Sequence, residues 1–139
     1  WVGAPTVYYG DEAGVCGFTD PDNRRTYPWG RENKELLAFH KEMIRIHKQE
    51  KPLRKGSIKL LYAERNVLAY ARFQEVPVWF AAVPKQGRME RLMYTYEEGY
   101  TTEYDEFIVE NGEIVINMGR HSAIVMKPIS EGEKTWQGK

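Results

Sequence analysis

Residues 6–29 constrain the fold more than any other stretch, because a short apolar run leads directly into a charged loop. Residues 6–9 are all β-branched or aromatic, without polar alternation, which is typical of a strand covered on both faces. Pro5 suits the start of such a strand, since it lacks the N–H that a central ladder requires. Asp11 and Glu12 follow the run. Because α/β proteins place ligands at the carboxyl ends of parallel strands, this loop is the first candidate for a functional site.

One long motif in this stretch reads GAPTVYYGDE at residues 3–12, DPDNRR at 20–25 and YPW at 27–29. It resembles the eighth barrel strand and following loop of the α-amylase family of glycoside hydrolases. Within that family it is most similar to the neopullulanase/cyclomaltodextrinase branch. The resemblance implies a (β/α)8 barrel that hydrolyses α-glucan linkages with retention, followed by a β-sandwich called domain C. It is strong over residues 3–29 and holds only in outline beyond Pro52.

The catalytic groups of such an enzyme are expected outside this chain. A retaining glycosidase needs two carboxylates roughly 5–5.5 Å apart, one as nucleophile and one as acid/base. In the family both lie at the ends of middle barrel strands, and a third Asp precedes the last strand; the chain begins at Trp1, after all three. We therefore expect a C-terminal part with no catalytic residue of its own and no activity alone. Its partners would be the rest of the barrel and an α-glucan substrate. Because a single parallel strand cannot satisfy its own ladder, residues 1–29 are expected to be poorly ordered, exchanged into another copy or docked non-natively when the chain is isolated.

Length and composition agree with a part of a larger protein. The chain has 139 residues, whereas a whole (β/α)8 barrel needs roughly 250. Twenty basic and twenty acidic residues cancel, which argues against a nucleic-acid or anionic-membrane partner. Cys16 is the single cysteine, so no internal disulfide forms, and a reducing, cytoplasmic location is expected. There is no membrane span or signal peptide, and a first residue other than Met indicates a fragment or a processed chain.

Residues 33–49 are predicted to form one amphipathic helix, which by the resemblance is the last helix of the barrel. Asn33 is a good N-cap, and Pro52 is expected to end the helix. At 100° per residue, one half of the helix carries its apolar residues and two histidines: Leu36, Leu37, Phe39, His40, Met43, Ile44, Ile46 and His47.

The two histidines of this face have two interpretations. As metal ligands or proton carriers, His40 and His47 would need a third group, which one helix face does not supply, and Cys16 is distant in sequence. We favour half-buried packing and expect neither a metal nor a cofactor.

Beyond a linker at residues 53–56, the pattern changes to short strands. Strands are expected at residues 57–62, 67–73, 76–83, 89–94, 104–109, 113–118 and 121–127. Asn111 and Gly112 predict a two-residue hairpin turn, because both tolerate positive φ. Short strands joined by tight turns predict an antiparallel sandwich. The expected fold class is therefore α+β.

The predicted division places the end of the barrel in residues 1–52, the β-sandwich in residues 53–130 and a polar tail in residues 131–139.

The resemblance assigns a substrate role to Asp20 and Arg24, which would bind a glucose unit on the non-reducing side of the cleaved bond. A carboxylate accepts sugar hydroxyls and a guanidinium donates in a fixed fork; the alternative is a salt bridge that stabilises the loop. Asp11 and Glu12 are not an acid/base couple, since neighbouring strand residues point to opposite faces. With Trp29 they are expected to order the loop at the barrel mouth.

An alternative function is a non-catalytic carbohydrate-binding or assembly module. In an extended segment Tyr94 and Tyr96 lie on one face and could form a platform for a sugar, although packing with the hydroxyl in solvent is the preferred interpretation. The acidic run nearby is interpreted as a solvated loop, because it lacks calcium-loop spacing. It comprises Glu97, Glu98, Glu103, Asp105 and Glu106.

Overall fold

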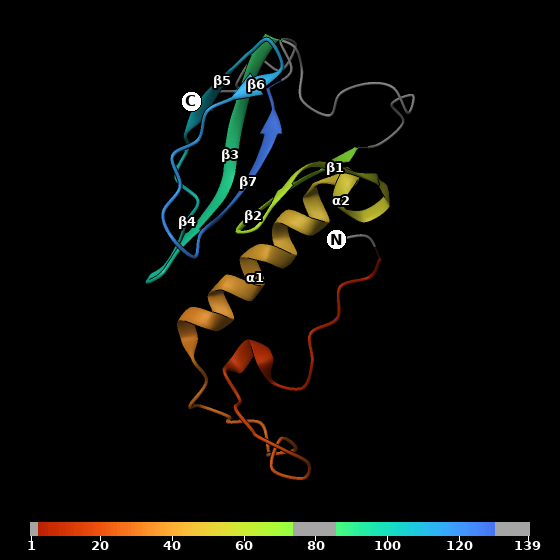
Figure 1. Cartoon of the computed structure of the whole chain (residues 1–139). Coiled ribbons are helices and arrows are strands. Elements are labelled where there is room, and N and C mark those ends of the chain that lie inside the picture. Colours follow the sequence, from red (N-terminus) through yellow and green to blue (C-terminus); the bar gives the residue numbers. More distant parts are fainter. Residues whose placement is uncertain (1–2, 74–85, 130–139) are drawn as a thin grey trace, which may run out of the picture. The chain divides into compact units, whose positions relative to one another are not determined.

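The computed structural model describes residues 3–73 and 86–129 (Figure 1). The chain divides into two compact units, Trp1–Val76 and Pro77–Lys139. The two α-helices of the described residues belong to the first unit, and the described part of the chain is α+β with more strand than helix. The strand expected at residues 76–83 and the tail at 131–139 lie outside the described residues. Over the described ranges, no helix has the length and apolar character needed to cross a bilayer.

The strand expected at residues 6–9 is not formed in this chain. These residues make no ladder with any strand of the described ranges, and the side chains of Val7, Tyr8 and Tyr9 are exposed. The physical reason is that a parallel strand cannot satisfy its own N–H and C=O groups without neighbours. A 3₁₀ turn, η1 (Asp11–Ala13), follows instead.

The predicted helix is confirmed as α1 (Lys34–Gln49). The Asn33 side chain accepts a hydrogen bond from the Leu36 N–H at 3.0 Å, as an N-cap does. The Asn33 N–H donates to the carbonyl of Ala13 at 3.0 Å, which joins η1 to the start of the helix. Ala13 and Ile46 are the buried apolar residues of this part of the unit.

The linker expected after Pro52 is largely a second helix, α2 (Lys51–Lys55), with Glu50 at its N-cap position. Proline is accepted in a first helical turn because its missing N–H would have no intrahelical partner there. Pro52 therefore helps to begin a helix, in addition to following the end of α1.

Strands β1 (Ser57–Glu64) and β2 (Val67–Phe73) form an antiparallel hairpin with Leu60 opposite Tyr70. Gly56 precedes the hairpin at a close backbone approach. A Cβ there would lie 2.3 Å from the Pro52 carbonyl oxygen and 2.6 Å from that of Phe73, so only glycine fits.

The second unit is an antiparallel sheet built on β3 (Gln86–Tyr96), the longest strand described. It pairs with β4 (Gly99–Thr101), β5 (Glu106–Glu110) and β7 (Ala123–Pro128). Since Met89 and Glu90 pair with both β5 and β7, these two strands lie on opposite edges of β3. Met89, Met93 and Val109 are buried and form its core.

The last strands differ in length from the prediction. The turn at Asn111 and Gly112 has φ values of 54° and 80°, as predicted for a hairpin. However, β6 spans only Glu113–Ile114, because residues 115–118 find no ladder partner among the described strands. The pairing of all described strands is antiparallel, as expected for the strands of a sandwich.

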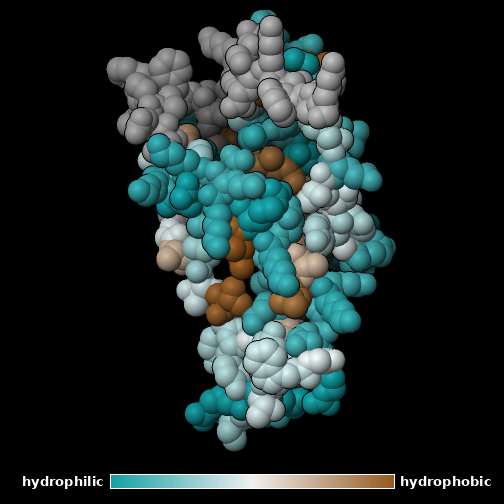
Figure 2. All heavy atoms as spheres, turned by 180° about the vertical axis from the view of Figure 1, so that it is seen from behind, coloured by the Kyte–Doolittle hydropathy of each residue, from teal (hydrophilic) through white to brown (hydrophobic). Residues whose placement is uncertain are grey.

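Large apolar side chains reach the surface between charged ones, as the brown atoms of Figure 2 show on one face. On the β1–β2 hairpin they include Leu60, Leu68 and Tyr70. Leu60 and Tyr70 are direct cross-strand partners, so their side chains share one face of the hairpin.

Candidate functional site

The loop after η1 brings the predicted pair Asp20 and Arg24 together. Arg24 donates from Nη2 to one carboxylate oxygen of Asp20 at 2.7 Å, and its Nε lies 2.7 Å from the other. The two side chains thus form a bidentate fork while each remains 63% exposed. Because solvent screens exposed ion pairs, this pair adds little to stability; its main effect is to orient both groups.

A second ion pair, which the sequence reasoning missed, braces the same loop. Asp22 Oδ1 accepts from Arg25 Nη2 at 2.6 Å and from Nε at 3.1 Å, and its Oδ2 accepts from the Phe18 N–H at 3.2 Å. The Arg25 hydrogen bond, followed by that of the Phe18 N–H, lowers the pKa of the Asp22 carboxyl. The sequence signal was the spacing of an acid and an arginine three residues apart.

The backbone of the loop closes tightly between Gly17 and Asn23. A Cβ on Gly17 would lie 2.3 Å from the Cα of Asn23, so any other residue would push the loop open. Tyr9 donates its hydroxyl hydrogen to the carbonyl of Arg25, which ties the N-terminal segment to the loop. These contacts close the loop, and the Asp20–Arg24 fork is presented on it.

Asp11 and Glu12 lie in η1 rather than on a strand, with Asp11 exposed and Glu12 half-buried. The pKa of Tyr27 is raised, first by desolvation and then by the negative charges of Glu12 and Glu32. Glu12 is therefore close enough to act electrostatically on the far end of the loop. Asp11 takes part in the turn through its backbone, donating to the Tyr8 carbonyl at 2.8 Å and accepting from the Gly14 N–H at 3.1 Å; its role in ordering the loop stays a prediction.

Trp29 is 81% exposed, and its ring packs on that of Tyr27 with centroids 4.5 Å apart. Within the described part of this chain, Tyr27 is therefore the aromatic ring that Trp29 packs against.

The two histidines of α1 are partly buried, and the contacts of His40 lie within its own helix. His40 Nδ1 donates to the carbonyl of Leu36 at 2.9 Å, and its ring meets Phe39 edge-on. His47 is half-buried. Among residues 3–73 and 86–129, no three His, Cys, Asp or Glu side chains gather as a metal site would require.

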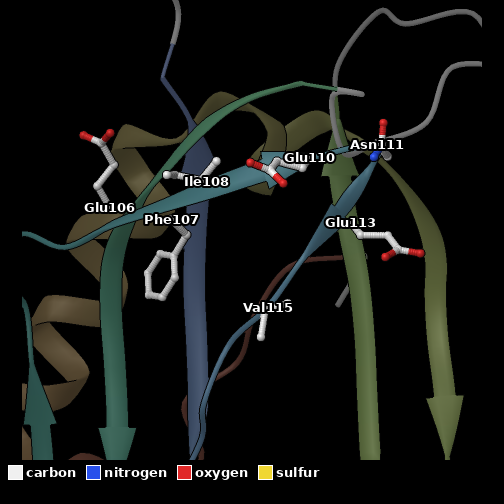
Figure 3. Close-up of a pocket in the computed structure, with 7 residues that line it drawn as sticks. All are labelled: Glu106, Phe107, Ile108, Glu110, Asn111, Glu113 and Val115. Carbon is white, nitrogen blue, oxygen red and sulfur yellow. The ribbon is translucent and has the colours of Figure 1, made fainter.

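A hollow of about 470 Å³ opens on the second unit at the β5–β6 hairpin (Figure 3). Figure 3 shows Glu106, Ile108 and Glu110 on β5, Asn111 at the turn and Glu113 on the returning strand. Glu106 is engaged by Arg88 at 2.9 Å and by the Tyr104 hydroxyl at 2.7 Å. Its lining includes none of the substrate-binding or loop-ordering residues predicted from the sequence, and no nucleophile–base pair.

Comparison with known proteins gives consistent relatives. No family model matches the chain. It is 31% identical over 144 aligned residues to neopullulanase 2 of Thermoactinomyces vulgaris, covering 100% of this chain and 24% of that protein. An amylopullulanase of Thermoanaerobacter thermohydrosulfuricus is 49% identical over 70 residues, or 50% of this chain and 5% of the relative. A cyclomaltodextrinase of Thermoanaerobacter pseudethanolicus is 43% identical over 74 residues, or 52% of this chain and 13% of the relative.

These relatives are much longer than the aligned part. The chain spans between 5% and 24% of their lengths.

Proposed function

Because the homologues of this chain are enzymes of the α-amylase family, we propose that it is the C-terminal part of a retaining glycoside hydrolase acting on α-glucans such as maltooligosaccharides, pullulan or cyclodextrins. Residues 1–52 would supply the last strand, the substrate loop and the last helix of a (β/α)8 barrel. Residues 53–130 would supply the β-sandwich of domain C. The observation that carries the proposal is the Asp20–Arg24 fork on a braced loop, in a chain that aligns over its whole length with a neopullulanase.

Asp20 and Arg24 would bind one glucose unit of the substrate. Two carboxylate oxygens and a guanidinium in a fixed fork match adjacent sugar hydroxyls, which both donate and accept. Since the fork exists before substrate arrives, binding would not have to order these two side chains. Asp22 and Arg25 would hold the loop in shape and make no contact with the sugar.

Residues 6–9 would pair with neighbouring strands contributed by the rest of the barrel. Their exposed apolar side chains and lack of ladder partners within the described ranges are consistent with a segment whose neighbours lie elsewhere in a longer protein. In the same arrangement Trp29 would be covered by the barrel mouth, with Asp11 and Glu12 ordering the loop beside it.

The first test is the activity of the isolated chain. Since the nucleophile and the acid/base would both lie upstream, the pure 139-residue chain should release no glucose or maltose from maltotriose. A measurable rate, with no intact enzyme present, would contradict the proposal.

The second test uses the longer enzyme that contains this segment. Asp20→Asn and Arg24→Gln should each lower kcat/KM on maltooligosaccharides by about 10-fold or more, as expected for loss of a charged hydrogen bond to substrate. Asp105→Asn in the second unit is the matched control and should leave kcat/KM unchanged. Wild-type kinetics in both loop variants would show that this pair does not bind substrate.

A further inference from the structure

Two tyrosine rings lie side by side on β3. Tyr94 and Tyr96 are two residues apart on one strand, so their side chains share a face of the sheet. Their ring centroids are 6.2 Å apart and their planes differ by 32°. The two tilted rings lie next to each other on the same face of β3.

Both rings are held in place by their surroundings. The Tyr94 oxygen accepts from the Gly119 N–H at 3.0 Å, which anchors the ring to the loop before β7. Tyr96 lies opposite Gly99 across the β3–β4 hairpin, and a Cβ on that glycine would be 3.9 Å from the Tyr96 ring. A ligand would therefore meet rings whose orientation is already set.

Packing accounts for only part of this arrangement. A tyrosine placed over a cross-strand glycine stabilises a hairpin, which explains one side of Tyr96. The ring nevertheless remains 40% exposed, with the half-buried Tyr94 ring beside it. Exposed aromatic surface at a hairpin end is what a binding platform would require.

The groups around the platform favour an uncharged, hydroxyl-rich ligand. Glu97 and Glu98 form the exposed turn directly after Tyr96, and carboxylates accept hydrogen bonds from hydroxyls. They also repel anions, which argues against nucleic acid. A pyranose ring has a C–H face that suits the negative face of an aromatic ring, and hydroxyls at its rim that suit the carboxylates.

We propose that Tyr94 and Tyr96 form a carbohydrate-binding platform that takes a chain of α-linked glucose units. The site shares no residue with the loop of Asp20 and Arg24 and belongs to the other unit of the chain. Only the identity of the sugar rests on the proposed function; the platform geometry stands independently of it.

The test is a titration of the whole 139-residue chain with maltohexaose, followed by NMR amide and tyrosine ring shifts. Saturable shifts are expected at residues 94–101 and 119–122. Tyr96→Ala should weaken binding by about tenfold, the loss of one aromatic stacking contact. Tyr96→Trp should retain binding, because it keeps a flat aromatic face. Tyr104→Ala is the matched control, an exposed tyrosine of the same unit, and should bind as wild type.

Three outcomes would overturn the proposal. These are the absence of saturable shifts in residues 94–101, equal binding by Tyr96→Ala in a sheet that retains its β3 amide pattern, or equal binding of the β-linked cellohexaose. Asp20→Asn separates this proposal from the enzymatic one. If it abolishes maltohexaose binding while Tyr96→Ala does not, the sugar binds to the loop and the platform is excluded. If Asp20→Asn impairs only the complete enzyme, both proposals stand.

Discussion

The N-terminal residues 3–32 and the sheet of residues 86–129 are held together in different ways. Of residues 3–32, Ala13 alone is buried, and the loop is shaped by ion pairs whose side chains are 49–63% exposed to water. The sheet is shaped by the ladders that β3 forms on both of its edges and by the buried Met89, Met93 and Val109. The stretch with the most specific motif is therefore the one that supports itself least.

This difference has a physical basis. Exposed ion pairs contribute little, because water and salt screen them, whereas a fully buried aliphatic side chain contributes roughly 1.5–3 kcal/mol. A substrate loop needs exposed, oriented polar groups more than it needs a core. Its rigidity must then come from whatever surrounds it, which in our proposal is the rest of a barrel.

The largest expected effect is a truncation in the core of the sheet. Met93 is 1% exposed, so Met93→Ala should lower the free energy of unfolding of the second unit by about 2–5 kcal/mol through lost burial and a cavity. Denaturant unfolding followed by β3 amide signals measures it. Ile108→Ala, at an exposed position of β5, is the control and should change stability by less than about 0.5 kcal/mol. Equal effects would show that the sheet is not organised around this core.

The next effect concerns the β5–β6 turn. Gly112 has φ +80°, and a Cβ added there would meet no other atom within 4 Å, so Gly112→Ala should cost about 1–2 kcal/mol from backbone strain alone. Gly119, the position of the control Gly119→Ala, has no positive φ, and a Cβ there would make only an ordinary contact, at 3.5 Å to the Tyr94 oxygen. The control should be neutral or slightly stabilising. A thermal unfolding comparison that ranks the two variants the other way would contradict the turn geometry.

A smaller effect is expected at the start of α1. Asn33→Ala removes the side-chain acceptor of the Leu36 N–H and should cost about 1 kcal/mol. Amide exchange in the first turn of α1 should quicken, while β3 amides should not change. Asn117→Ala, an exposed loop position, should leave both regions as they are.

The smallest effect is a pH response confined to the loop. The folded state lowers the pKa of Asp22 below its ordinary 3.8. The stabilisation from its ionised form is therefore fully present above that value and is lost as pH falls through the lowered pKa. The Phe18 amide shift should titrate in this acidic range, and Asp22→Asn should abolish the titration. An unchanged Phe18 titration in that variant would show that another group controls it.

The features that depend on local interactions could be predicted from the sequence. Residues 33–49 carry both an N-cap and an apolar stripe, and the structure has a helix there. Asn111 and Gly112 tolerate positive φ, and both adopt it at the centre of the turn. The strand at Val67–Phe73 matches its predicted limits, because its β-branched and aromatic residues and flanking turn are local signals.

What depends on distant partners was predicted less well. Residues 6–9 have the composition of a buried strand, and the sequence predicts that they lack their neighbours in the isolated chain, but not where they would lie instead. Residues 115–118 have an alternating pattern and likewise find no ladder partner in the described sheet. In the candidate site, Asp20 and Arg24 form the salt bridge that is the alternative to substrate binding, and their substrate role stays a prediction. The Asp22 brace depends on how the loop folds back to the Phe18 N–H.

Hydrogen exchange on the 139-residue chain tests the central claim most directly, by comparing amides 6–9 with those of Met89 and Met93 on β3. We predict strong protection on β3, where the ladder is complete, and almost none at residues 6–9, whose neighbours would belong to the rest of the barrel. Equal protection of the two segments would mean that the N-terminal stretch completes its own hydrogen bonding, and the account of it as part of a larger barrel would be wrong.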